Sequence, residues 1–287
     1  MEHFKKDSPF LKGYGLRPYH YLEWLKNPPK GAFVIEAITE NYLGHRGGPA
    51  LYYLDRICDG RTVFLHGVSL NIGAAEKLDM GYLDELSLLI KRLKPTIVSD
   101  HLSFSAISGK YSHSLLPLPR NQKTASFLRS KIHAAQEALS HPLVFENISR
   151  YVNYKDDELS EMEFAIEALK GTGAKLLLDV NNLYVTCFNE GSSAMDELLK
   201  IPKGFAAQYH IAGHETCDGY LFDTHSGPIL KEVWQLLDVA LDRVGERPVV
   251  LERDDHNPLS ISMQDFERRP RYDEGARAVK EDARELS

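Results

Sequence analysis

The segment KLLLDV at residues 175–180 has the composition of one strand of a parallel β-sheet. Its apolar residues follow one another without alternation, as expected where both faces of a strand are buried. The segment carries an acidic residue, Asp179, at the end of this apolar run. A carboxylate in such a place is costly unless it is paired or binds a metal ion. The segment therefore indicates both a buried parallel sheet and a functional group at the end of a strand.

Seven further segments repeat this pattern, and polar turns and helical patterns separate them. Most of the segments are rich in Val, Ile, Leu and Phe. They are GYGLR at 13–17, AFVIEAI at 32–38, TVFLH at 62–66, TIVSD at 96–100, LVFEN at 143–147, AAQYHI at 206–211 and PVVLE at 248–252. The clearest helical pattern lies at residues 233–244, where six apolar residues fall on one face of a helix.

Strands that alternate with helices indicate βαβ units and a parallel sheet. Eight such units in 287 residues favour a closed (β/α)8 barrel, the TIM barrel. An open doubly wound sheet is the alternative, but it would more often carry GxGxxG after the first strand, where this chain has GYGLRPYH. We predict a single domain over residues 1–287, with a barrel core at about 13–258 and a charged C-terminal extension at about 265–287.

Charge and composition exclude several classes of protein. The net charge of −7 provides no basic surplus, which argues against a nucleic-acid partner. Three cysteines without a CxxC pair favour a reducing compartment, and Cys187 and Cys217 are expected in loops as ordinary thiols rather than nucleophiles. The N-terminus lacks the apolar run of a signal peptide, and no apolar run of membrane-spanning length occurs. We therefore expect a cytoplasmic protein without a membrane partner.

Ionisable side chains end at least six consecutive strands of the predicted barrel. In such a barrel the C-terminal ends of the strands converge on one face, where active sites are built. Imidazole and carboxylate ligands together suit iron, zinc or manganese. We therefore predict a metal site from this set: His66, Asp100, His101, Glu146, Asp179, His210 with His214 four residues later, and Glu252.

Four residues near the same face are candidates for binding a substrate. Arg17 ends the first strand and could anchor a substrate carboxylate, although a structural ion pair is an equal alternative. Glu40 and Asn41 lie just past the second strand. His113 lies in the long loop after the fourth strand, where it is either a surface histidine or a substrate contact and proton donor.

Nine motifs along the chain carry a family resemblance. They are EAITENY at 36–42, LHGVSLNIG at 65–73, SDHLSF at 99–104, LLPLP at 115–119, FENIS at 145–149, LLDVNNLYV at 177–185, HIAGH at 210–214, DTH at 223–225 and LERD at 251–254. In this order they resemble the DUF692 family of multinuclear non-heme iron-dependent oxidases, which includes the methanobactin enzyme MbnB. The chain departs from many members in two places. It has His113 and Ser114 where an acidic residue precedes LLPLP, and it lacks a Trp before Glu252.

The resemblance implies a xylose-isomerase-like barrel that holds two or three iron ions, mixed Fe(II) and Fe(III), and uses O2 as co-substrate. It implies an oxidase that modifies cysteine residues of a ribosomally synthesised precursor peptide, in several cases beside a small partner protein. Glu146, Asp179 and His210 are the expected catalytic residues, and Glu146 could bridge two metal ions because a carboxylate has two oxygens. The implied metal ligands are His66, His101, Glu146, Asp179, Asn182, His210, His214, Asp223, His225 and Glu252.

Two other functions remain open from the sequence. One is redox-neutral chemistry at a multinuclear zinc or manganese site, either sugar isomerisation or phosphodiester hydrolysis. The other is a binding module without catalysis, which the full set of ligand-type residues argues against because such groups destabilise a barrel mouth without a metal ion.

Overall fold

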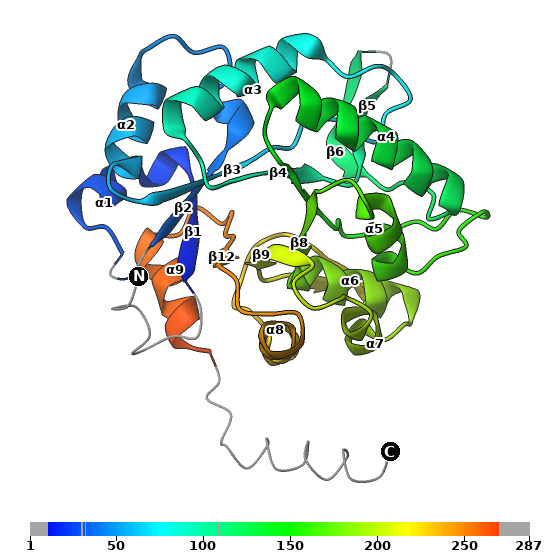
Figure 1. The fold of residues 1–287 in the computed structure, drawn as a ribbon. Helices are drawn as coiled ribbons and strands as arrows, with labels where there is room; N and C mark the ends of the chain where they lie inside the picture. The colour runs from blue at the N-terminus through cyan, green and yellow to red at the C-terminus, as the bar shows by residue number, and fades with distance from the viewer. Residues whose placement is uncertain (1–10, 30, 32, 108, 270–287) are drawn as a thin grey trace.

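Eight parallel strands form a closed barrel in the computed structural model, which describes residues 11–29, 31, 33–107 and 109–269 (Figure 1). The barrel strands are β1 (Lys12–Leu16), β2 (Val34–Ile38), β3 (Thr62–His66), β4 (Ile97–His101), β7 (Val144–Glu146), β8 (Lys175–Asp179), β9 (Ala206–Ile211) and β12 (Val249–Leu251). Each overlaps one of the eight predicted segments. The barrel closes where β1 pairs with β12, with Tyr14 opposite Leu251. The predicted TIM barrel is confirmed.

Helices surround the barrel on the outside, as Figure 1 shows. They are α1 (Tyr21–Lys26), α2 (Pro49–Cys58), α3 (Met80–Leu93), α4 (Gln122–Leu139), α5 (Glu161–Leu169), α6 (Val180–Glu190), α7 (Ala194–Leu199), α8 (Lys231–Arg243) and α9 (Leu259–Glu267), with short 3-10 turns η1 (Pro18–His20) and η2 (Thr39–Asn41). Side-chain caps fix several helix starts: Asp79 and Asn121 cap α3 and α4. The predicted apolar face of α8 is buried, including Val233, Leu237 and Ala240.

The barrel interior consists of an apolar layer below a polar one. Six buried residues from six strands form a cluster separate from the main core between strands and helices: Val34, Phe64, Ile97, Val144, Leu177 and Val250. Alternate residues of a strand point to the same face. The residues two positions further on are therefore also inside, nearer the C-terminal ends of the strands: Glu36, His66, Ser99, Glu146, Asp179 and Glu252. This alternation places a set of ligand-type side chains next to a layer of buried apolar side chains inside the barrel.

Two hairpins outside the barrel were not predicted. One is β5 (Phe104–Ile107) with β6 (Lys110–Leu116), and the other is β10 (Glu215–Cys217) with β11 (Tyr220–Phe222). His113 therefore lies on strand β6 instead of in the predicted loop. Cys187 lies in helix α6 and is buried, so its predicted loop position is wrong, whereas Cys217 is exposed on β10.

Helix α9 includes the first residues of the predicted charged extension, from Asp265 onward. Asp265 and Phe266 are buried, and the Phe266 ring lies 5.3 Å from that of Tyr14 on β1. The last described part of the chain therefore packs beside the first barrel strand, as Figure 1 also shows. Residues 270–287 of the predicted extension lie outside the described residues. Among the described helices, none has the length and apolar character needed to span a membrane.

Candidate metal centre

Glu146 lies at the centre of the polar layer, at the end of β7. Its Oε2 lies 3.2 Å from Nε2 of both His66 and His101. Its Oε1 lies 3.2 Å from Nδ1 of His210. The side chain is 1% exposed, so this carboxylate has exchanged water for three imidazole rings from three other strands.

The rings of His66 and His101 are oriented by groups behind them. Nδ1 of His66 lies 2.9 Å from the Ser99 hydroxyl, which itself donates to the carbonyl of Leu65 and can therefore accept. Nδ1 of His101 lies 3.0 Å from the carbonyl oxygen of Gly67. A proton on each Nδ1 leaves Nε2 as the ligand atom, and both Nε2 atoms face Glu146. Histidines that bind metals in proteins are oriented in this way.

A second group of ligand atoms lies on the other side of Glu146. His210 on β9 places Nδ1 3.1 Å from Oε2 of Glu252 as well as near Glu146. Asp179, fully buried at the end of β8, completes a set of four residues whose ligand atoms all lie within 4.8 Å of one another: Glu146, Asp179, His210 and Glu252. Asn147 fixes this end of β8, because its amide exchanges hydrogen bonds of 3.0 Å with the backbone of Asp179.

Charge coupling dominates the titration of the centre. Burial opposes charge on His101, but Glu146 and Asp100 outweigh it and raise the pKa of His101 to about 10. Burial likewise opposes charge on Glu146, yet the three histidines lower the pKa of this carboxyl. Burial, with Glu146 and Asp223 adding to it, raises the pKa of Asp179 well above its usual range. Asp179 is therefore the acid of the centre that lacks a compensating positive charge, and a bound cation would supply it.

Two buried oxygen atoms without hydrogen-bond partners indicate that the residues of the centre fit a metal cluster. Oε2 of Glu146 and Oδ2 of Asp179 are buried polar atoms that receive no hydrogen bond from the described residues. Buried polar atoms are normally satisfied, so atoms left without a partner need an explanation. Ligand atoms of His66, His101 and Glu146 also lie within 4.8 Å of one another, so two ligand groups share Glu146. Two cations bridged by this carboxylate would satisfy both atoms.

The sequence of this chain matches the family described as the RiPP precursor modification enzyme MbnB/TglH/ChrH over residues 11–269. RiPPs are ribosomally synthesised and post-translationally modified peptides. The chain belongs to this family. The family resemblance inferred from the nine motifs is thereby confirmed, and the RiPP-modifying family places the barrel among enzymes that act on precursor peptides.

Relatives of known sequence and solved structures agree with this assignment. A UPF0276 protein of Acaryochloris marina is 38% identical over 246 residues, which cover 86% of this chain and 88% of that protein. A UPF0276 protein of Rhizorhabdus wittichii is 39% identical over 259 residues, covering 90% and 92%. The apo 3-keto-D-glucoside 4-epimerase YcjR from E. coli has a TM-score of 0.58 at 11% identity, covering 90% of this chain and 98% of its own. Endonuclease IV from Thermus thermophilus has a TM-score of 0.56 at 12% identity, covering 89% and 98%. These structures share the fold.

Three further residues of the predicted ligand set, His214, Asp223 and His225, lie at the rim of the centre. Nε2 of His225 lies 3.2 Å from Oδ1 of Asp223 and 3.8 Å from Oε2 of Glu252. Nδ1 of His214 lies 2.7 Å from Oδ1 of Asn181, whose amide nitrogen donates to Asp223. This leaves Nε2 of His214 buried without a partner in the described residues. His225 has φ 47°, a left-handed conformation that a histidine rarely adopts and that marks a constrained site.

Asn182 and Arg17 both contact other protein groups beside the centre. The Asn182 amide donates to the carbonyl of Asn147, and its oxygen accepts from Ser149, so its side chain is engaged beside the centre. Arg17 has Nε 2.6 Å from Asp254 and Nη2 3.5 Å from Glu252. The structure thus shows the ion-pair alternative for Arg17. A Cβ at Gly15 would lie 2.7 Å from Nη1 of Arg17, so a larger residue there would displace the end of the Arg17 side chain.

The other predicted substrate residues lie around the loop after β3. Oε1 of Glu40 accepts from the Val68 amide at 3.0 Å and from the Tyr82 hydroxyl at 2.8 Å, while Oε2 is buried without a partner in the described residues. Asn41 is exposed at the end of η2. His113 lines a cavity of about 390 Å³ together with Val68. His113 is exposed and has φ 55°, a left-handed backbone conformation.

Sequence reasoning did not include Glu36 and Gln208 among the site residues. Oε1 of Glu36 lies 2.8 Å from Nε2 of His210, and Gln208 donates to Oε2 of Glu36. Glu36 lies in the second predicted strand, and its spacing of two residues from Val34 is the signal that places it inside the barrel. Gln208 precedes His210 by two residues on β9, so the same alternation places both side chains inside, but an amide is not a typical metal ligand and its residue type did not mark it as part of the site.

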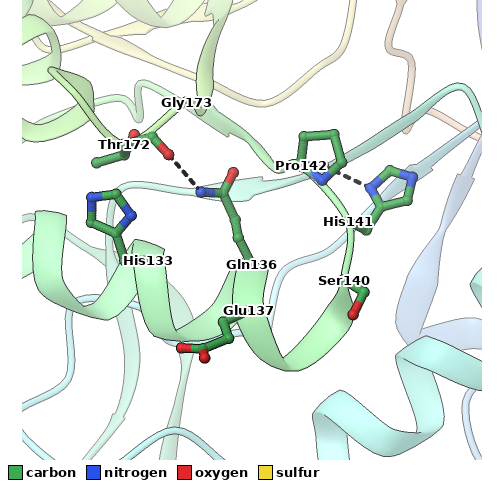
Figure 2. A pocket seen from close by; sticks show the side chains of 8 residues that line it. All are labelled: His133, Gln136, Glu137, Ser140, His141, Pro142, Thr172 and Gly173. Atoms are coloured by element: carbon green, nitrogen blue, oxygen red, sulfur yellow. Dashed lines mark hydrogen bonds between the residues drawn. The ribbon is translucent and has the colours of Figure 1, made fainter.

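A second cavity, of about 450 Å³, lies at the opposite end of the barrel strands (Figure 2). It is lined by the end of α4 and by the loops before β7 and β8, including His133, Glu137 and His141. Nδ1 of His141 lies 2.7 Å from the carbonyl of Pro142. The three groups of potential ligands in the described residues all lie in the polar layer and none lies here, so the catalytic candidate is the C-terminal end of the barrel.

Proposed function

We propose that this protein is a multinuclear non-heme iron-dependent oxidase that uses O2 to modify cysteine residues of a ribosomally synthesised precursor peptide. Membership of a family that modifies such precursors supports the peptide substrate. The mixture of imidazole and carboxylate ligands supports iron, although zinc and manganese accept the same ligands.

The observation that carries the proposal is the position of Glu146 between two ligand groups. His66 and His101 face one of its oxygens, and His210 faces the other, with Asp179 and Glu252 beside it. A carboxylate placed in this way could hold two metal ions, because it has two oxygens. His214, Asp223 and His225 at the rim offer ligand atoms for a third.

Iron ions held by these groups would supply the electron transfer that reduces O2 and oxidises the cysteine. The chain itself contributes a rigid arrangement of ligands on an apolar floor, formed by Val34, Phe64 and Val144 among others. Ligands on strands of the barrel are held more precisely than ligands on loops. Cys187 and Cys58 are poor alternative nucleophiles, because burial raises the pKa of the Cys187 thiol to about 11 and that of Cys58 to about 12.

The test is co-expression with a cysteine-containing peptide encoded by a small open reading frame beside the gene, followed by mass spectrometry. We expect a mass change that requires the chain, O2 and the peptide cysteines, with a Cys→Ser peptide as control. A mass change that persists without O2, or with the Cys→Ser peptide, would contradict the oxidase. Turnover with zinc alone and no O2 consumption would favour redox-neutral chemistry instead.

A further inference from the structure

Glu36 faces the opposite side of the His210 ring from the other acids of the centre. Its Oε1 lies 2.8 Å from Nε2 of His210. Glu146 and Glu252 lie 3.2 and 3.1 Å from Nδ1 of the same ring. Glu36 is 2% exposed and His210 is 0% exposed, so water cannot replace any of these contacts. Each nitrogen of the ring therefore has a carboxylate partner, and only one of the two can be the metal ligand.

The neighbours of each nitrogen decide between the two. Nδ1 faces the group in which Glu146, Asp179 and Glu252 can surround a cation. Nε2 faces Glu36 and the amide nitrogen of Gln208, which lies 2.8 Å away. An amide nitrogen can only donate, so Gln208 would donate to Nε2 when this nitrogen carries no proton, whereas a proton on Nε2 has Glu36 as its acceptor. Glu36 is therefore the acceptor for a proton on Nε2, and Gln208 holds this carboxylate in place by donating to its other oxygen.

His210 differs in this respect from the other two histidines of the polar layer. Nδ1 of His66 contacts the Ser99 hydroxyl, and Nδ1 of His101 contacts the carbonyl oxygen of Gly67. Both of these acceptors are neutral, whereas Glu36 is a carboxylate. The rings also differ in orientation. His66 and His101 face Glu146 with Nε2, whereas His210 faces it with Nδ1.

We propose that Glu36 is a positioning residue that accepts the Nε2 proton of His210 and directs Nδ1 of that ring to the metal ion shared with Glu146, Asp179 and Glu252. The inference rests on the proposed function only in requiring a metal ion at the centre. A carboxylate behind a ligating histidine fixes its tautomer and raises its basicity. An ion bound through Nδ1 of His210 would therefore be held more tightly with Glu36 in place than without it.

The tautomer of His210 tests the proposal without any change to Glu36. The chain labelled with 15N-histidine is loaded with Zn²⁺ as a diamagnetic probe and studied by long-range 1H–15N correlation, with single histidine variants for assignment. We expect His210 to carry its proton on Nε2 and the metal on Nδ1, and His66 and His101 to show the opposite arrangement. Metal on Nε2 of His210 would overturn the proposal, since Glu36 would then lie at the metal as a direct ligand with His66.

Substitution of Glu36 provides the second test. Glu36→Gln is expected to keep the number of Zn²⁺ ions per chain and to weaken the binding of one of them about 10- to 100-fold, as for outer-shell partners elsewhere. Ser99→Ala is the matched control, since it removes a neutral acceptor behind His66 and should weaken binding less. Complete loss of one ion from Glu36→Gln at saturating Zn²⁺, or unchanged affinity, would contradict the proposal. If this variant does not fold, the tautomer of the unaltered chain still decides. A chain that binds Zn²⁺ as expected but never accepts iron would refute the proposed oxidase and leave this inference standing.

Discussion

At the scale of single residues, the centre depends on Glu146 more than on any other side chain. Three histidines contact its two oxygens, and an uncharged isostere at this position would leave them facing an amide. We expect Glu146→Gln to lose at least one metal ion per chain and to lower metal affinity at least about 100-fold, the upper end of the effect of outer-shell partners. Metal analysis after anaerobic reconstitution measures both. His133→Ala, in the cavity at the other end of the barrel, is the control and should keep its metal content. Full metal content and turnover in Glu146→Gln would show that it is not a bridge.

A buried acid away from the centre gives the chain a predictable dependence on pH. Burial raises the pKa of Glu161 to about 7, although Arg150 and Arg120 oppose the shift. In the unfolded chain its pKa is about 4.3. As pH rises from about 4 to about 7, the folded state keeps this proton whereas the unfolded state loses it. The free energy of unfolding therefore falls across this pH range and stays at the lower value above about pH 7.

We therefore expect the free energy of unfolding of Glu161→Gln, relative to that of the unaltered chain, to increase from pH 5 to pH 8 by about 3 kcal/mol at most. Urea unfolding at both pH values measures the difference between the two chains. A difference that is the same at pH 5 and at pH 8 would show that Glu161 keeps an ordinary pKa in the folded protein.

Much of the candidate site could be predicted from single residues. Ionisable groups at the ends of apolar strands identified His66, Glu146, Asp179 and His210, because their position in a barrel follows from the strand that carries them. The contacts of Arg17 and Asn182 could not be predicted in this way. Their side chains are long or amide-bearing, and which partner they reach depends on loops such as 252–254 that carry no periodic signal.

At the scale of elements, the loop after β9 packs tightly against the loop that carries His225. A Cβ at Gly213 would lie 2.7 Å from the carbonyl oxygen of Gly227 and closer still to that of Ser226. We expect Gly213→Ala to separate the two loops, to cost about 1–3 kcal/mol as overpacking does, and to disturb binding at His214 and His225. Thermal unfolding and metal content measure these effects.

Gly47→Ala is the matched control for this prediction. A Cβ at Gly47 would meet no atom within 4 Å, and its φ is not positive. We expect its effect to stay within about 0.5 kcal/mol. Equal effects of the two substitutions would show that the contact between the loops does not position the rim histidines.

The barrel strands and the two hairpins differ in how well the sequence predicts them. The eight strands are predictable because burial on both faces requires continuous apolar runs. Strand β6 is mostly exposed, and β10 and β11 are both short and mostly exposed, so no such run marks them. The hairpin β10–β11 is held to helix α6 by Asn189, whose amide exchanges hydrogen bonds of 2.9 Å with the backbone of Leu221. A contact between segments this far apart leaves no local pattern.

At the scale of the whole molecule, metal ions are expected to stabilise the fold. Glu36, Glu146, Asp179 and Glu252 converge in the same buried layer, and their mutual repulsion is relieved by cations. An ion present at about 100 times its dissociation constant stabilises the folded state by about 2.7 kcal/mol. Removing it with a chelator should therefore lower the midpoint of thermal unfolding by roughly 5–10 °C. Anaerobic addition of ferrous iron should restore the midpoint. A midpoint that changes neither with the chelator nor with added iron would contradict a structural role for the metal.

The central claim is that Glu146 joins two iron ions, with a third available at the rim. Mössbauer spectroscopy on protein grown with iron-57, together with metal analysis, tests it most directly. We expect two or three irons per chain, including an antiferromagnetically coupled ferrous–ferric pair that Glu146→Gln abolishes. Stoichiometric zinc without iron, persisting after anaerobic iron reconstitution, would contradict the claim and would direct attention to hydrolysis or isomerisation.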